Sequence, residues 1–283
     1  MTQVLASDPR PADQAARAGP LQSLATRFPI LFVAVAILSL ILVQYVWLFV
    51  VPSLSDSARN VAAKVSECVL ALLLVSGLAW WHRVGFIRWR WRDFLCALPL
   101  LFLPALMLVS QLGKVHVSQQ IVLFALLAAM TAFAEETVFR GIAIRVLEPR
   151  GVVYAVIVSS VIFGLAHFVN LLQGSSLPVT IGQVVFAGLI GVAFAAPFIY
   201  TGSIWPIIVF HFIQDFVAFW TTGSLKNTAP SSLSDVVLPI LLIIPVTLYG
   251  VWLIRRYLAN RGPVPAPRLA TPLQTGQFSP AQD

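Results

Sequence analysis

Glu135-Glu136-Thr137-Val138-Phe139-Arg140 places three charges inside an otherwise apolar run that begins near Ile121. On insertion scales, a carboxylate or guanidinium at the centre of a membrane helix costs about 2.5 to 3.5 kcal/mol. Ionisable groups at such depth are functional as a rule, although these three could also form only a buried ionic network that holds helices together. We therefore expect the chain to use them.

The composition is that of a membrane protein. Of the 283 residues, 59% are hydrophobic and only 10% are charged, whereas charged residues make up about a quarter of a typical soluble domain. Eight apolar runs are each long enough for a transmembrane helix, and they are continuous, without the period-two alternation of membrane strands. They cover residues 28–51, 61–81, 94–112, 121–147, 152–172, 179–200, 204–220 and 236–257. We predict an all-α polytopic membrane protein, a bundle of about eight transmembrane helices.

The predicted organisation is one transmembrane domain between two tails. The domain covers residues 28–258, and the core that carries its motifs covers 121–220. Residues 1–27 and 259–283 combine Pro and Gly with small and polar residues, a composition typical of disordered segments.

The basic residues indicate topology. The formal net charge is +7, but the Lys and Arg residues lie between apolar runs and form no basic-aromatic nucleic-acid motif, so nucleic acid is not an expected partner. When loops are alternated between the two sides of a bilayer, one side collects most of the Arg residues. Because cytoplasmic loops carry this excess, we predict a multi-pass protein of the cell membrane with both termini in the cytoplasm.

Glu136 and Arg140 are predicted to pair along their own helix. Each helical residue advances about 100°, so side chains four residues apart share one face. Glu135 then points elsewhere and is free to face another helix.

His167 lies in the next apolar run, in Phe163-Gly164-Leu165-Ala166-His167. Taken singly, such a histidine is more often a hydrogen-bonded packing residue. Its depth favours a larger role, because Glu135 lies fifteen residues before Arg150 and His167 seventeen after it. In an antiparallel hairpin the mismatch is only about 3 Å, within side-chain reach.

His211 and Asp215 also stand four residues apart, so one helix can present both to a single centre. An internal His–Asp hydrogen bond is the simpler alternative. Glu67 lies close to Lys64 near the end of its run, and we interpret that pair as side chains that snorkel toward the interface.

Together, Glu135, His167, His211 and Asp215 could supply a water-activating base, oxyanion stabilisers or metal ligands. The sequence contains no Gly-x-Ser-x-Gly, Walker or His-Glu-x-x-His motif. Hydrolysis by an activated water is the most economical interpretation.

The ordered motifs resemble those of the CAAX-protease and bacteriocin-processing (CPBP) family of intramembrane proteases, which includes the type II CAAX prenyl endopeptidases. Glu135-Glu136-x-x-x-Arg140 is similar to the first family motif, Phe163-x-x-x-His167 to the second and His211-x-x-x-Asp215 to the third.

The resemblance implies an endopeptidase that cleaves a membrane-associated or lipid-anchored peptide or protein within the lipid bilayer. Glu135 would be the general base, His167 would hold the same water, and His211 with Asp215 would serve the oxyanion or a metal. Glu136, Arg140 and Phe163 would be structural and substrate-orienting residues.

Two mechanisms fit these residues. Zinc or another divalent metal could be held by His167, His211 and Asp215, or Glu135 could activate water without a metal. Prenyl-processing members of the family usually carry Asn at the position of Asp215. An ionised Asp cannot donate a hydrogen bond to an oxyanion, so this departure favours the broader bacterial branch.

The rival hypothesis is a non-enzymatic membrane protein, either an ion- or proton-coupled carrier or a scaffold with a degenerate protease fold. Carriers usually contain internal repeats, and the two halves of this chain show none.

Overall fold

The computed structural model describes residues 19–110, 120–223 and 234–260, which form helices joined by turns and irregular segments and contain no strand. Within these ranges the predicted all-α fold is confirmed. The helices are, in chain order, α2 (Pro20–Arg27), α3 (Pro29–Val50), α4 (Asp56–Gly77), α5 (Trp81–Val84), the 3-10 helix η1 (Trp91–Leu101), α6 (Phe102–Ser110), α7 (Ile121–Glu135), the π-helix η2 (Glu136–Ile144), α8 (Arg145–Leu147), the 3-10 helix η3 (Glu148–Arg150), α9 (Val152–Ala166), the 3-10 helix η4 (His167–Gln173), α10 (Leu177–Thr201), α11 (Trp205–Thr222) and α12 (Ser234–Asn260).

Seven helical stretches in the described part of the chain are long and apolar enough to cross a membrane. They are Pro29–Trp47, Asp56–Gly77, Trp91–Ser110, Ile121–Arg150, Val152–Leu172, Leu177–Thr201 and Val237–Asn260. The remaining predicted segment, 204–220, does form a helix, α11. Its polar side chains His211, Gln214 and Asp215 lower its mean hydropathy, so it is not one of the seven.

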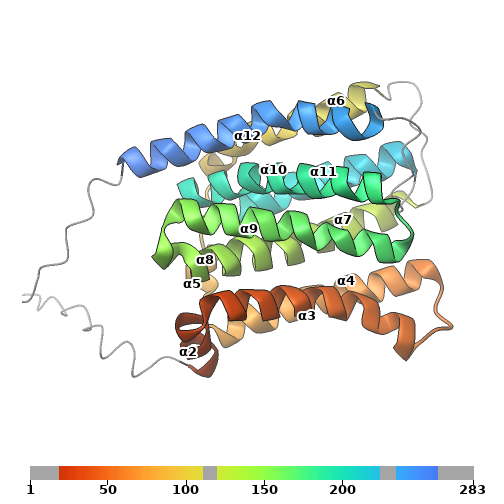
Figure 1. Cartoon of the computed structure of the whole chain (residues 1–283), viewed down its shortest axis with the longest axis horizontal. Helices are drawn as coiled ribbons and strands as arrows, with labels where there is room; N and C mark the ends of the chain where they lie inside the picture. Colours follow the sequence, from red (N-terminus) through yellow and green to blue (C-terminus); the bar gives the residue numbers. More distant parts are fainter. Residues whose placement is uncertain (1–18, 111–119, 224–233, 261–283) are drawn as a thin grey trace, which may run out of the picture.

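The long helices lie side by side as one bundle (Figure 1). α3 and α4 form one side of it, α6 and α12 the opposite side, and α7, α9, α10 and α11 lie between them. α11 packs along α7, and α10 packs against both α9 and α12. The polar helix α11 is therefore enclosed by more apolar helices.

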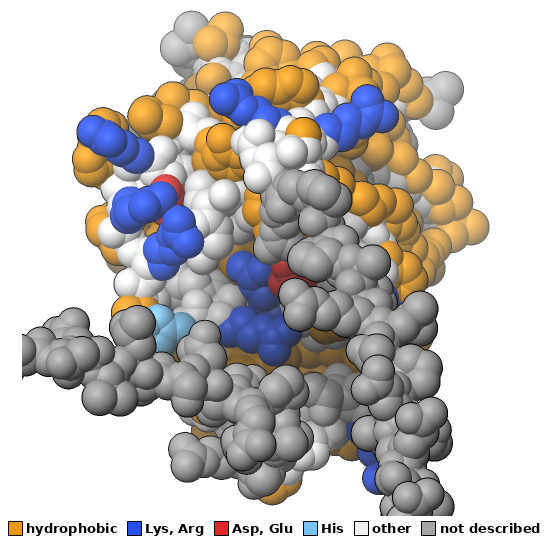
Figure 2. Space-filling view, turned by 90° about the vertical axis from the view of Figure 1, so that its left-hand side faces the viewer, with side chains coloured by type: hydrophobic (Ala, Val, Ile, Leu, Met, Phe, Trp, Pro, Cys, Tyr) orange, Lys and Arg blue, Asp and Glu red, His pale blue; other side chains and the backbone are white. Residues whose placement is uncertain are grey.

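Basic side chains gather at the end of the bundle where α5 and α8 lie (Figures 1 and 2). There Nη2 of Arg83 donates to the carbonyl of Arg145 over 2.9 Å, and Nε of Arg145 donates to the carbonyl of Arg83 over 2.9 Å. These reciprocal hydrogen bonds join α5 to α8. The expected concentration of Arg at one end is thus present, while its assignment to the cytoplasm stays a prediction.

The N-terminal tail is shorter than predicted. Pro20–Arg27 form helix α2, which begins with a proline at its first turn and buries Ala25. The Gln22 amide donates to the carbonyl of Leu78 and so ties α2 to the end of α4. The prediction of a disordered tail is therefore wrong for these eight residues. The rest of that tail, and all but the first two residues of the C-terminal tail, lie outside the described residues.

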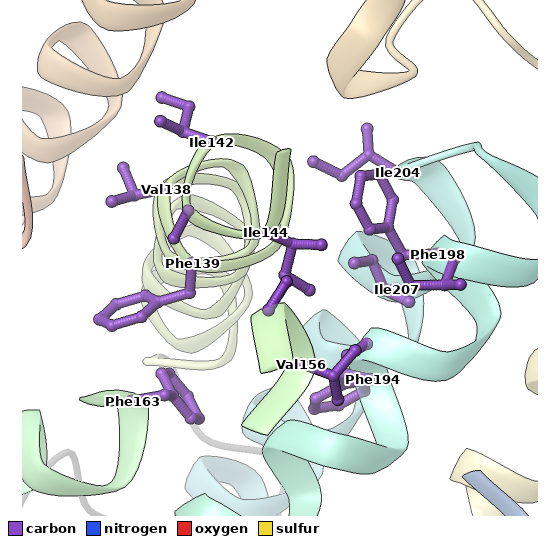
Figure 3. Close-up of a cluster of buried hydrophobic side chains, with 14 of the residues drawn as sticks. Val138, Phe139, Ile142, Ile144, Val156, Phe163, Phe194, Phe198, Ile204 and Ile207 are labelled. Carbon is purple, nitrogen blue, oxygen red and sulfur yellow. The ribbon is translucent and has the colours of Figure 1, made fainter. Parts of the chain in front are cut away.

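A core of aliphatic and aromatic side chains surrounds η2. Figure 3 shows side chains of η2, α9, α10 and α11 turned toward one another, with Phe139 next to Phe163 and Ile144 facing Phe198 and Ile207. All nine residues of η2 are buried. The segment that carries Glu136 and Arg140 is thus the most enclosed part of the bundle.

Gly85 permits a close approach at the basic end. Its φ is +90°, and an added Cβ would collide with the carbonyl oxygen of Gly202 and crowd the backbone of Ile204. Only glycine adopts this conformation without strain and leaves room for the neighbouring backbone.

We expect Gly85→Ala to lower stability by about 2 kcal/mol more than Gly174→Ala. A side chain at either position is strained by the left-handed backbone, because φ is +90° at Gly85 and +87° at Gly174. An added Cβ at Gly174, however, meets nothing within 4 Å. The extra loss comes from overpacking. Thermal unfolding of the two variants in the same detergent measures it, and equal melting temperatures would contradict the close approach.

Candidate active site

The predicted catalytic segment is not a regular α-helix. The sequence suggested one helix over 121–147, but α7 ends at Glu135 and the chain continues as a π-helix to Ile144. The hydroxyl of Thr137 donates to the carbonyl of Phe133 over 2.6 Å, a side-chain bond of the kind that competes with the regular helical ladder. π-helical turns are rare and occur frequently at functional sites. Glu135 and Glu136 lie at the junction.

Glu136 accepts hydrogen bonds from two side chains. Arg140 Nη1 donates to Glu136 Oε1 over 3.1 Å, as predicted, and Nδ1 of His211 lies 2.7 Å from the same oxygen. Both Glu136 and Arg140 are 0% exposed. Because a carboxylate paired with a guanidinium accepts hydrogen bonds, Nδ1 of His211 is the protonated nitrogen. The link to His211 was not predicted.

Arg140 lies among aromatic rings. Its guanidinium carbon is 4.1 Å from the centre of the Phe163 ring and 5.8 Å from that of Phe194. These are cation–π distances, and such contacts are strongest in the absence of water. Within the described residues, Arg140 Nε and Nη2 and Glu136 Oε2 have no hydrogen-bond partner.

The other nitrogen of His211 also faces carboxylates. Nε2 is 3.5 Å from Asp215 Oδ2 and 4.0 Å from Glu135 Oε2. The ring stacks on Phe194, with 5.2 Å between the ring centres. His211 therefore contacts acidic groups at both nitrogens and is fixed in orientation by an aromatic face.

His167 is oriented by its own helix. Its Nδ1 is 2.9 Å from the carbonyl oxygen of Phe163. A carbonyl can only accept, so Nδ1 carries the proton and Nε2 of the neutral ring carries the lone pair. The ring also meets the edge of Phe163 at 5.1 Å between centres.

The structure brings the predicted catalytic residues to one cavity of about 420 Å³ between α3, α4, α7, α9, η4, α10 and α11. Its wall includes Glu135, His167, His211, Asp215 and the ring of Phe163. The side chains of Glu135 and Asp215 are 21% and 24% exposed. Glu136 and Arg140 do not line the cavity and lie behind His211. The predicted split between Glu135 and the Glu136–Arg140 pair matches this arrangement.

The same cavity contains a charged pair that the sequence analysis misjudged. Lys64 Nζ donates to both carboxylate oxygens of Glu67, over 3.1 and 2.9 Å, and both residues line the cavity. Glu67 is only 2% exposed, so the interpretation of the pair as snorkelling toward the interface is wrong. A carboxylate within an apolar run was the signal that could have identified it.

The donors for a metal do not form a complete set as they stand. In both His167 and His211 a hydrogen bond holds Nδ1, and Nε2 is the nitrogen on the far side of the ring, as in metal-binding histidines. In the ranges the structure describes, however, no three His, Cys, Asp or Glu side chains are arranged to hold an ion.

Comparison with protein families matches residues 117–217 to the family described as type II CAAX prenyl endopeptidase, Rce1-like. The match covers a little over a third of the chain and contains all three motifs. It confirms the resemblance to the CPBP proteases. Comparisons with curated proteins and with solved structures each found no match.

We expect Glu136→Gln to destabilise the protein by about 3 kcal/mol. The change leaves the buried Arg140 charge without its counter-ion, and breaking a buried pair in this way typically costs about 3 to 5 kcal/mol. Thermal unfolding in detergent is the measurement. Glu148→Gln, which breaks the partly exposed pair with Arg145, is the matched control and should cost less than about 1 kcal/mol. Similar losses in the two variants would refute the central role of Glu136.

Proposed function

We propose that this chain, whose residues 117–217 match the Rce1-like type II CAAX prenyl endopeptidase family, hydrolyses a peptide bond in a membrane-associated or lipid-anchored peptide. The family match supports a CAAX-protease-type intramembrane endopeptidase in general. The observation that carries the specific proposal is the presence of Glu135, His167, His211 and Asp215 on the wall of one cavity.

Glu135 and His167 hold the attacking water. The Glu135 carboxylate accepts one hydrogen bond from the water and Nε2 of His167 accepts the other, which leaves a lone pair of the water oxygen directed at the substrate carbonyl. As the oxygen attacks the carbonyl carbon, Glu135 takes the proton and later delivers it to the leaving amine. This is general base and then general acid catalysis by one group.

His211 stabilises the oxyanion. Nδ1 donates to Glu136 over 2.7 Å, and with the Asp215 carboxylate 3.5 Å from Nε2 we take the ring in its doubly protonated form. The Nε2 proton is then available to the oxygen that becomes negative during attack. Asp215 and Glu136 orient the ring and balance its charge. In this role Asp215 does not need to donate a hydrogen bond to the oxyanion.

Arg140 and Phe163 support the site from behind. Arg140 fixes the Glu136 carboxylate, and Phe163 covers the guanidinium with its ring while its carbonyl orients His167. We further propose that the basic end of the bundle and both termini lie in the cytoplasm and that the protein resides in the cell membrane.

Glu135→Gln should reduce cleavage at least 100-fold, because general acid–base groups contribute about 10²- to 10⁴-fold. The assay is mass spectrometry of a farnesylated CAAX peptide, and of the same peptide without the lipid, incubated with protein in proteoliposomes. Glu148→Gln, outside the cavity, is the control and should retain activity. Equal rates for wild-type protein and Glu135→Gln would remove the proteolytic role.

A second measurement concerns the metal. Because both nitrogens of His211 face carboxylates and no three-ligand set is formed by the described residues, we expect protein treated with a chelator to keep its cleavage rate. The predicted alternative is a divalent ion held by His167, His211 and Asp215. A stoichiometric metal signal that is lost in both His167→Ala and His211→Ala, together with inactivation by the chelator, would establish that alternative.

A further inference from the structure

The Lys64–Glu67 pair is not used by the proposed chemistry, although it lines the same cavity. It belongs to α4, outside the stretch that matches the family, and none of the three motifs includes it. A buried ion pair is weak evidence for stability, because removing two charges from water offsets most of their attraction. The pair therefore calls for a role other than holding helices together.

Both side chains line the cavity, and Lys64 is the more accessible of the two. The Lys64 side chain is 18% exposed, whereas that of Glu67 is 2% exposed. An ammonium has three protons to donate, and Glu67 accepts from it at both carboxylate oxygens. A ligand in the cavity can therefore reach the Lys64 side chain, which Glu67 holds in place.

Two hydrogen bonds fix α4 beside the site. Trp47 Nε1 donates to Ser66 Oγ over 3.0 Å, and Cys68 Sγ donates to the carbonyl of Met130 over 3.4 Å. The first joins α3 to α4, and the second joins α4 to α7, the helix that ends at Glu135. Lys64 is thus positioned on a fixed part of the wall.

Lys64 and Glu135 lie at different levels of the cavity. α4 and α7 both run toward the basic end of the bundle (Figure 1). Lys64 precedes Cys68 by four residues and Met130 precedes Glu135 by five, so at 1.5 Å per residue the backbone positions of Lys64 and Glu135 are about 13 Å apart along the axes. Their side chains approach more closely, because the charges of Glu135 and Asp215 act on Lys64. An extended peptide of about four residues spans that distance, and a shorter peptide suffices where the side chains of Lys64 and Glu135 extend toward each other.

This distance matches the distance between the two charged ends of a short peptide. Hydrolysis by the proposed mechanism creates an amine at Glu135 and Asp215, and a terminal segment of up to about four residues carries a carboxylate at its other end. The cavity volume of about 420 Å³ lies near the lower end of the range for ligand pockets, about 300–1,000 Å³, which suits a short segment.

We propose that Lys64 is a substrate-binding residue that takes a carboxylate at the C-terminal end of the segment released by cleavage. The proposal rests on the proposed function for the direction of the substrate. Binding of the carboxylate by Lys64 does not depend on catalysis. The same ammonium could receive an acidic side chain of the substrate, and the experiment separates these two sources.

The test compares peptides that differ only at their end. A fluorescent farnesylated peptide is prepared as the free acid, as the C-terminal amide, and as an amide with Asp as its last residue. Dissociation constants are measured by anisotropy with full-length protein in nanodiscs, and kcat/KM is measured in the same sample. For wild-type protein we expect the free acid to bind about tenfold or more tightly than the plain amide.

Variants at Lys64 decide the assignment. Lys64→Met should bind acid and amide equally, and Lys64→Arg should keep the preference for the acid. The control is Arg59→Met, which removes the cation of the Arg59–Asp56 pair, also at i,i+3 on α4 but outside the cavity; it should leave the preference unchanged. A preference for the Asp amide as strong as for the acid would assign the carboxylate to a side chain.

Two outcomes overturn the proposal. One is the absence of any difference between acid and plain amide in wild-type binding, and the other is a preference that persists in Lys64→Met. Loss of cleavage with retained acid-selective binding would instead contradict the proposed function alone, so the two failures are distinguishable.

Discussion

The Glu136 carboxylate is the group on which the rest of the site depends. One of its oxygens lies 3.1 Å from Arg140 Nη1 and 2.7 Å from Nδ1 of His211. Burying any one of these three groups alone in an apolar bundle costs free energy. Their contacts with one another offset that cost. The orientation of His211, and hence the direction of its Nε2 toward the cavity, follows from this contact.

The apolar shell makes the contact strong. η2 is buried along its whole length, and the rings of Phe163 and Phe194 cover Arg140 and His211. With water excluded, charge-assisted hydrogen bonds weaken little through screening. Aromatic faces add attraction to the guanidinium without competing for hydrogen bonds. The fold thus uses hydrophobic packing to keep a small ionic cluster rigid.

Much of this arrangement could be predicted from local patterns. Continuous apolar runs gave the helical bundle, and spacing of four residues gave the Glu136–Arg140 pair. The Glu136–His211 contact joins positions 75 apart, and no periodicity reports which faces of two distant helices meet. The π-helix was missed because the apolar run 121–147 is continuous and carries no signal for a change of helix type. Lys64 and Glu67 were misjudged because distance from the end of a run does not show which side of α4 faces the cavity.

The two histidines are fixed to different helical segments, so the site has two parts. His211 is fixed to η2 through Glu136, whereas His167 is fixed to the carbonyl of Phe163 on its own helix, α9. Phe163 also packs on Arg140, and Ser159 Oγ of α9 donates to the carbonyl of Phe139 in η2 over 2.6 Å, so the two parts are joined by a directional bond as well as by ring packing. The relative position of the two histidines is therefore set by how α9 packs against η2. Because hydrophobic mismatch with the bilayer changes helix tilt, we expect the thickness of the surrounding lipid to influence this packing.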